Sequence, residues 1–469
     1  MYVCTYYWWC MVPTIQNSAH ALFSLALCDS RHKPITCVAN PVRGATITLV
    51  IPYHTTPSTS TMMMIPSTLP HTWLSECRNP VFTWTIGETA YGFYLSSLPT
   101  WIELLVLAAA HMLMAALFSV LIYYTIIKKQ RKTFTTFLLT FGIYLPFWVL
   151  APRTVLDMWG FQNKLFRFTL LVITPTLSSF RLMEAFFGFT PPHATRSVAD
   201  FGLYYGSALI ARFDNKTQKY VQSNTRIAVL HLSRFLFLLF LTGMYQSMFN
   251  LHPYFPTLGV KVQETENYYS LRHVIHPSKW KDTALYAILL QQYLTTFGEG
   301  LMFATNVLTG IQTQKIMLNP MFASASPSDF WGRRWNLLIH ASLKGAVYKP
   351  VLSLGGPQSL AVLAAFVASA LFHEWVLVGT FLDYPNQLGA NTVFFVWQAM
   401  LVAVEFLLVK WNLLPKRMIH SIPKPVRSIL VVLCGVPFGR WFLESYVCSN
   451  FFEQGHMVMM SVLPLHFGS

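Results

Sequence analysis

The sequence contains few charged residues for its length. Only 11% of its 469 residues are Asp, Glu, Lys or Arg, whereas soluble globular domains carry about 25%. At the same time 54% of the residues are hydrophobic, and the mean hydropathy is +0.44. A soluble chain of this length needs a charged surface that this composition does not supply. The composition therefore excludes an ordinary soluble enzyme and predicts an all-α polytopic membrane protein.

Acidic residues are especially scarce. The chain has 18 Asp and Glu against 33 Lys and Arg, which gives a formal net charge of +15. The basic residues lie in short clusters beside apolar segments, which is the positive-inside pattern of membrane proteins. This pattern predicts attraction to anionic lipids or to a phosphate-bearing substrate, and it does not favour a nucleic-acid partner.

Several catalytic motifs are also absent. The sequence has no Gly-x-Ser-x-Gly nucleophile elbow, no Walker loop and no His-Glu-x-x-His zinc helix. Carboxylates within the apolar segments are too few for an evident proton or ion relay. We therefore expect no metal site and no bound cofactor.

Apolar runs of about 20 residues are long enough to cross the hydrocarbon core of a bilayer. The third run is short and contains Pro175, so we expect a tilted, broken or re-entrant segment there. The segment 337–347 is too short to span and is predicted to be a buried or interfacial helix. About eight spanning helices are expected, at residues 103–127, 134–151, 165–180, 227–249, 284–308, 359–382, 392–411 and 428–447.

The basic clusters predict the orientation of these spans. Four basic residues between Lys128 and Lys132 directly follow the first span, which places that loop on the cytosolic side. Alternation then makes three further basic loops cytosolic, at residues 181–226, 311–349 and 412–427.

Three regions follow from this orientation. Residues 1–100 form an N-terminal extension that is expected to be lumenal or poorly ordered, residues 101–450 the transmembrane domain, and residues 451–469 a short C-terminal tail. Five of the seven cysteines lie in the extension, where a lumenal position permits disulfides.

Two polar places interrupt the apolar runs. Residues 319–336 contain three charges, two Trp and two Asn, and the pair His373-Glu374 lies within the apolar run 360–382. Ionisable side chains at membrane depth are costly and mark functional sites by default. Together they predict a membrane-embedded reaction site.

His373 is the candidate general base, because imidazole is the usual base at neutral pH. The alternative is a histidine that only bonds a neighbouring helix, which is our interpretation of His111 and His231, each alone in a span. Consecutive helical residues point about 100° apart. We therefore expect Glu374 to face another surface than His373, where it binds a cation or substrate or stabilises the fold.

Asn336 is the second candidate catalytic residue, because its amide can polarise a carbonyl or hold an oxyanion. Its alternative role is to cap a helix that begins at Leu337.

Five charged or aromatic residues complete the candidate substrate-binding set with Glu374. Arg333 and Arg334 offer forked donors suited to phosphate, and Lys344 adds a third cation at the cytosolic side. Trp335 and Asp329 belong to the same polar segment. The alternative roles are interface anchoring for the arginines and membership of an aromatic belt for the Trp.

These residues carry a resemblance to a known family. Three blocks, Asn319-Pro-x-Phe, Ser-Asp-Phe-Trp-Gly-Arg-Arg-Trp-Asn336 and Val347-Tyr-x-Pro, resemble the wax synthase branch of the membrane-bound O-acyltransferase superfamily. The sequence Ala-Leu-Phe-His373-Glu fits the second motif of that branch, and Arg181-Leu-Met-Glu184-Ala-Phe-Phe-Gly-Phe-Thr resembles an upstream block. The resemblance covers residues 102–447.

The resemblance implies a helical fold around an intramembrane tunnel in the endoplasmic reticulum. Fatty acyl-CoA, as co-substrate, would enter from the cytosol and a long-chain alcohol from the bilayer, and they would meet at His373 to form a wax ester. Other acceptors remain open, namely diacylglycerol, sterols or terpenoid alcohols. A transporter with His373 along its path is the non-enzyme alternative. The sequence leaves the oligomeric state open.

Overall fold

The computed structural model divides the chain into two units, residues 1–65 and 66–469. All residues that the structure describes belong to the second unit. The five cysteines of the predicted extension lie outside them. The described residues are 80–86, 89–129, 133–158, 160, 163–171, 176–252, 254–256, 276–380, 388–411, 421–449 and 451–464.

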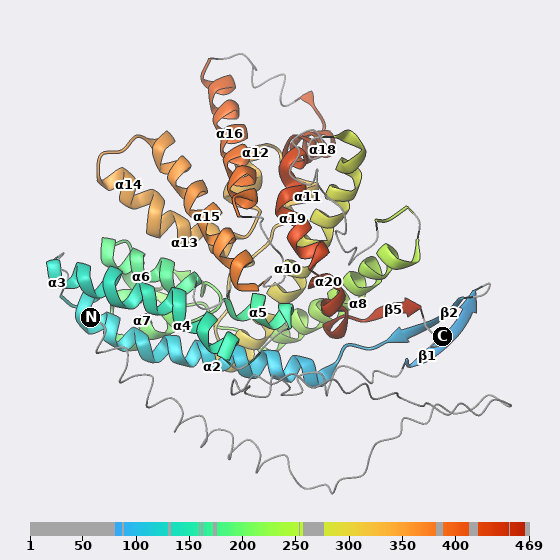
Figure 1. Cartoon of the computed structure of the whole chain (residues 1–469). Helices are drawn as coiled ribbons and strands as arrows, with labels where there is room; N and C mark the ends of the chain where they lie inside the picture. The colour runs from blue at the N-terminus through green and yellow to red at the C-terminus, as the bar shows by residue number, and fades with distance from the viewer. Residues whose placement is uncertain are drawn as a thin grey trace, which may run out of the picture. The chain divides into compact units, whose positions relative to one another are not determined.

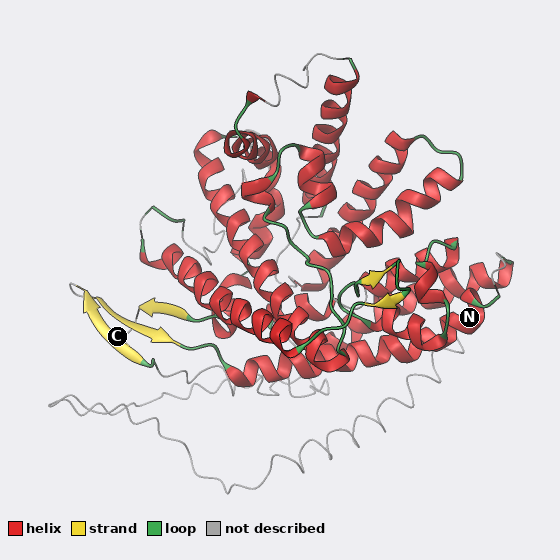
Figure 2. Cartoon of the chain, turned by 180° about the vertical axis from the view of Figure 1, so that it is seen from behind, coloured by secondary structure: helices red, strands yellow, loops and turns green. Residues whose placement is uncertain are grey.

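Helices make up most of the described part (Figures 1 and 2). Six helical segments within it are long and apolar enough to cross a membrane, and each coincides with one of the predicted spans. The polytopic membrane class is thereby confirmed. The main helices of these segments are α2 (Leu98–Ile122), α4 (Leu145–Met158), α8 (Thr225–Leu251), α15 (Gln358–Thr380), α16 (Ala390–Lys410) and α18 (Lys424–Gly435).

The remaining two predicted spans differ from the other six. The third is not one helix but two, α5 (Lys164–Leu171) and α6 (Leu177–Phe187), on either side of the segment that contains Pro175. Residues 172–175 between them, which include Pro175, lie outside the described residues. The count of eight spans therefore stays a prediction.

The fifth predicted span is the helix α10 (Trp280–Thr309), although it is not among the six apolar segments. Its end meets the start of α8, because Ser223 N donates to Gly310 O over 2.7 Å. The two helices are thus an antiparallel pair, and α10 is expected to cross with α8. Its composition is more polar than that of the six segments, since it contains Gln291 and Glu299. Both side chains are buried against protein.

A three-stranded antiparallel sheet joins the two ends of the described chain (Figure 1). Its order is β1 (Phe82–Ile86), β2 (Thr89–Tyr94) and β5 (Ser461–Pro464). Strand β2 precedes the first span and β5 follows the last, so both lie on one side and the number of crossings between them is even.

Residues 80–100 and 451–464 belong to the same compact unit as the helices, and the boundaries at residues 100 and 450 stay predictions. The fold is mostly helical, as predicted, and a second small sheet pairs β3 (Phe213–Asp214) with β4 (Lys219–Tyr220) (Figure 2). Hydrogen bonding between extended segments far apart in sequence leaves no local periodic pattern.

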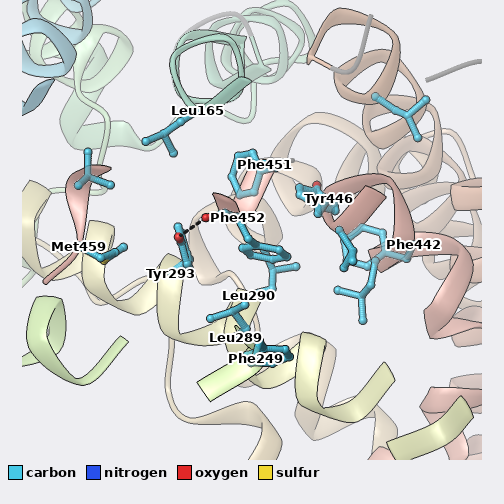
Figure 3. Close-up of a cluster of buried hydrophobic side chains, with 14 of the residues drawn as sticks. Leu165, Phe249, Leu289, Leu290, Tyr293, Phe442, Tyr446, Phe451, Phe452 and Met459 are labelled. Atoms are coloured by element: carbon cyan, nitrogen blue, oxygen red, sulfur yellow. Dashed lines mark hydrogen bonds between the residues drawn. The ribbon is translucent and has the colours of Figure 1, made fainter. Parts of the chain in front are cut away.

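The C-terminal segment is packed into the helical core. Helix α20 (Phe451–Gly455) contributes two buried Phe, and the hydroxyl of Tyr293 on α10 donates to the carbonyl of Phe452 at 3.5 Å (Figure 3). On α8, Gly243 leaves no room for a side chain against Met460, and Ser247 Oγ accepts from Val462 N at 2.8 Å. These contacts fix the end of the chain against α8 and α10.

A buried polar cluster connects α6 to the π-helical segment η6 (Lys344–Tyr348). Glu184 on α6 packs where Gly345 on η6 has no side chain, and it accepts a hydrogen bond from Tyr204 on α7 (Val198–Gly206). The guanidinium of Arg181 lies over the Tyr204 ring at 4.9 Å. Burial raises the pKa of Glu184 to about 7, against the opposing effects of Tyr204, Arg181 and Lys349.

Glu184 therefore predicts a pH-dependent stability. Because the pKa of Glu184 is raised on folding, protonated Glu184 stabilises the folded state. This stabilisation is complete below the ordinary carboxyl pKa and is lost as pH rises through about 7. We expect the thermal midpoint of the protein in detergent to fall between about pH 5 and pH 8, and Glu184→Gln to flatten this slope. The control is Asp214→Asn, since hydrogen bonds from Lys216 N and Thr217 Oγ1 hold the pKa of Asp214 below its ordinary value. An unchanged slope in Glu184→Gln would contradict the assignment.

Candidate active site

The polar segment 319–336 folds into two short helices, α11 (Pro320–Ala323) and α12 (Pro327–Arg333), which precede α13 (Leu337–Leu343). Ser326 caps α12 by accepting from Asp329 N at 3.2 Å, and a proline follows at the first helical position. Asn319 and Asn336 adopt left-handed backbone conformations, with φ of 50° and 39°. These two positions let the chain reverse direction before α11 and before α13.

Asp329 holds this segment together. Its carboxylate accepts from Arg334 Nε at 2.8 Å and from Ala325 N at 3.0 Å, and it lies 3.7 Å from Arg333 Nε. Burial alone would raise the pKa of Asp329, but these hydrogen bonds and both arginine charges hold it below its ordinary value. Arg334 also donates to Leu318 O at 3.3 Å. Each of the three charged residues therefore has a structural partner inside the motif.

A cavity of about 430 Å³ lies between α12, α13 with η6, α15 and α16. It brings together four of the predicted site residues, namely Trp335, Asn336, Lys344 and His373, and does not include Asp329, Arg333, Arg334 or Glu374. Its walls are formed by Ser328, Trp331, Gly332, Trp335, Asn336, Ile339, His340, Leu343, Lys344, Tyr348, Val362, Ala365, Phe366, Ser369, His373, Phe395 and Val402.

One wall of this cavity is polar. Asn336, His340, Lys344 and Tyr348 recur every four residues along α13 and η6, a spacing that keeps them on one helical face. Lys344 is exposed while the other three are half-buried, so Lys344 marks the opening. Burial, followed by the charge of Lys344, lowers the pKa of His340, which favours its neutral form.

The opposite walls are mainly apolar and aromatic. Trp331 contributes from α12, Trp335 from the turn that follows it, Phe366 from α15 and Phe395 from α16. The cavity is therefore amphiphilic, and it fits a ligand that has both a polar part and a hydrocarbon chain.

His373 lies between these walls with a defined tautomer. Its Nδ1 is 2.7 Å from Ser369 O. A carbonyl oxygen can only accept, so Nδ1 carries the hydrogen, and a neutral ring then presents the Nε2 lone pair. The rings of Phe372, Phe395 and Phe442 surround the imidazole at centroid distances of 4.8, 4.5 and 5.4 Å. Nε2 is thus the ring atom available to a substrate.

Glu374 has a different partner, as the helical spacing predicted. Its Oε1 accepts from Thr392 N at 2.8 Å and from Thr392 Oγ1 at 3.1 Å, in the first turn of α16. On α16, Glu405 accepts in the same way from the N and Oγ of Ser328, both at 2.8 Å. Both carboxylates thus bind the N-terminal turn of a neighbouring helix.

Asn336 has the capping role that the sequence offered as an alternative, and its catalytic role stays a prediction. Its Oδ1 accepts from Ile339 N at 3.3 Å, so the side chain caps α13. The residue also lines the cavity. With the oxygen committed to the cap, the amide nitrogen is the donor that remains for a substrate.

Sequence reasoning missed three cavity residues, His340, Tyr348 and Ser369. The four-residue spacing from Asn336 would have identified His340 and Tyr348, and Ser369 precedes His373 by the same interval. The part of the chain that the structure describes contains no group of three or more His, Cys, Asp or Glu residues that could hold a metal ion.

The chain is similar to known proteins across this site. The model of the membrane bound O-acyl transferase family matches residues 315–397, which include α12, α13, α15 and all the residues that line the cavity except Val402. Two Arabidopsis thaliana proteins named probable long-chain-alcohol O-fatty-acyltransferase, numbers 9 and 1, are 32% and 31% identical over 19% and 34% of this chain. The A. thaliana protein named acyl-CoA–sterol O-acyltransferase 1 is 42% identical over 12% of it.

The matches with these three proteins span 27%, 47% and 19% of the relatives' own lengths, so the chain spans less than half of each. The family match covers the Trp-Gly-Arg-Arg-Trp-Asn motif and His373. Over residues 315–397 the chain is therefore similar to the membrane bound O-acyl transferase family, and relatives that it matches are named probable long-chain-alcohol O-fatty-acyltransferases.

Proposed function

We propose that this membrane protein transfers a fatty acyl group from acyl-CoA to the hydroxyl of a long-chain alcohol, forming a wax ester at the endoplasmic reticulum. The observation that carries the proposal is a neutral imidazole with an available Nε2 in an amphiphilic cavity that also contains Asn336. The names of its relatives support an acyl transfer to an alcohol.

The chemistry follows from these two side chains. Nε2 of His373 removes the proton from the alcohol as its oxygen attacks the thioester carbonyl. The amide nitrogen of Asn336 donates to the oxygen on which negative charge develops. The carbon–sulfur bond then breaks, and the imidazolium returns its proton to the departing thiolate.

The two kinds of wall suit the two substrates. The polar wall from Asn336 to Lys344 would face the polar arm of acyl-CoA, with the Lys344 ammonium near its phosphates at the opening. The hydrocarbon chains would lie against Trp335, Phe366 and Phe395. Aromatic and aliphatic surface binds such chains through the hydrophobic effect, without needing directional contacts.

The identity of the acceptor can be tested by competition. We expect membranes that contain the protein to convert a labelled fatty acyl-CoA mainly to a wax ester when hexadecanol, diacylglycerol and a sterol are offered together. Some sterol or glycerol ester is expected too, because apolar pockets discriminate by only about 1–3 kcal/mol per methylene. Resolving the lipid products gives the answer. A dominant sterol ester would favour the acceptor named in the sterol relative, and no ester at all would favour the transporter alternative.

His373→Gln is expected to abolish most of the turnover. Glutamine preserves a polar side chain but cannot take the proton, and general-base assistance is worth about a hundred- to ten-thousandfold. Asn336→Ala should lower the turnover number as well, and it should also lower the thermal midpoint because the cap of α13 is lost. The measurement is the initial rate of ester formation at equal amounts of folded protein. Wild-type turnover in His373→Gln would exclude the proposed base.

Lys344→Gln is expected to raise the Michaelis constant for acyl-CoA and leave that for the alcohol nearly unchanged. The effect should weaken as salt rises, because the interaction with phosphate is screened within about a Debye length. Arg333→Gln is the matched control, since the side chain of Arg333 is 77% exposed and is not part of the cavity wall. An equal increase of the Michaelis constant for acyl-CoA in both variants would mean that the basic residues act only through the long-range electrostatic field of the protein.

A further inference from the structure

A second, smaller apolar cavity shares a wall with the reaction cavity. Its volume is about 70 Å³, and it lies between α10, α12, α16, α18 and the following helix α19 (Gly439–Cys448). Trp331 and Trp335 line both cavities. Phe442 lines the smaller cavity and also contacts the ring of His373 at 5.4 Å. The two spaces are therefore separated by a layer of aromatic side chains beside the proposed base.

The indole of Trp331 is held in this layer by hydrogen bonds. Its Nε1 donates to Gln398 Oε1 at 3.1 Å, and Gln398 Nε2 donates to Gly435 O at 3.2 Å. Gln398 is only 5% exposed, on the apolar helix α16. A buried amide is costly unless both of its ends are bonded, and here both ends serve to fix the indole.

The packing around the indole is aromatic on several sides. Its ring lies 5.7 Å from Phe395, 6.0 Å from Phe366 and 6.2 Å from Phe394. These contacts, together with the hydrogen bond to Gln398, leave one favoured orientation of the Trp331 side chain. The aromatic layer between the two cavities is thus held in place by specific contacts of Trp331.

We propose that Trp331 and Gln398 form a specificity-determining partition that limits the length of the hydrocarbon chain accepted in the reaction cavity. A chain that lies against Trp335 and extends toward α16 meets the fixed indole before it can enter the second cavity. This inference rests on the proposed function only in so far as the ligand is a fatty acyl chain or a fatty alcohol. The apolar lining of the second cavity and the aromatic walls of the reaction cavity are the reason for choosing a hydrocarbon ligand.

The effect of opening the partition can be estimated from hydrophobic burial. Each additional buried methylene contributes about 0.8 kcal/mol, which is about a fourfold gain in affinity. The space of the second cavity plus the volume freed by a smaller side chain would admit about two or more methylenes. Longer chains should then bind better instead of being rejected.

The test uses the full-length protein in lipid nanodiscs and two variants. Trp331→Phe removes the indole N–H and reduces the ring, and Gln398→Met removes the amide while keeping a similar volume. Trp441→Phe is the matched control, because Trp441 is a buried Trp on α19 that lines neither cavity. Saturated acyl-CoA chains of increasing length are compared at fixed alcohol, and alcohols of increasing length at fixed acyl-CoA.

Two readouts are measured for each series. One is kcat/KM for ester formation, and the other is displacement of a fluorescent acyl-CoA, which requires binding but no turnover. We expect the preferred length in one of the two series to increase by about two carbons or more in Trp331→Phe and in Gln398→Met, and not in Trp441→Phe. The series that shifts identifies the chain that reaches the partition.

The proposal is overturned if folded, ligand-binding Trp331→Phe and Gln398→Met keep the wild-type length profile in both series. Binding without ester formation by the wild-type protein would instead refute the proposed function, and the displacement series would still test the partition. A thermal midpoint close to that of Trp441→Phe establishes that the variants are folded.

Discussion

The arrangement of the site depends on how helix ends are satisfied in an apolar interior. The first backbone N–H groups of a helix have no partner within it, and in hydrocarbon each unsatisfied group costs several kcal/mol. Glu374 of α15 supplies the acceptor for α16, and Glu405 of α16 supplies one for α12. The two carboxylates connect three cavity-lining helices in sequence. Because His373 is adjacent to Glu374, the same contact fixes the imidazole relative to the aromatic side chains of α16.

A second constraint acts at the C-terminal end of α15. Arg167 on α5 is 1% exposed, and its Nε donates to Gly379 O at 2.7 Å while its Nη2 binds Asp157 on α4. A cation at a helix C-terminus stabilises the unpaired carbonyls there. A buried guanidinium needs this full set of partners, since burial of an unpaired charge is strongly destabilising. The helix that carries His373 is thus held at two points that follow the histidine, Glu374 and Gly379.

The sequence predicted the types of side chain at the site better than their partners. Arg333 and Arg334 were assigned to phosphate because of their charge, yet both bind Asp329 in the same motif. Local sequence shows that opposite charges are close, but which of them pair depends on the turn at Asn336. The same limit applies to α10. Its polar residues lower its hydropathy, although they face protein rather than lipid.

The sequence by itself determined the membrane class, six spans and the two polar segments of the site. These follow from local composition, because an apolar run of sufficient length has few alternatives to a bilayer. Only the tertiary structure decided which residues share the cavity, the tautomer of His373 and the pairing of β2 with β5. Each of these depends on contacts between segments far apart in the chain. Such contacts are selected by the packing of whole helices and by the hydrogen bonds that buried groups must find.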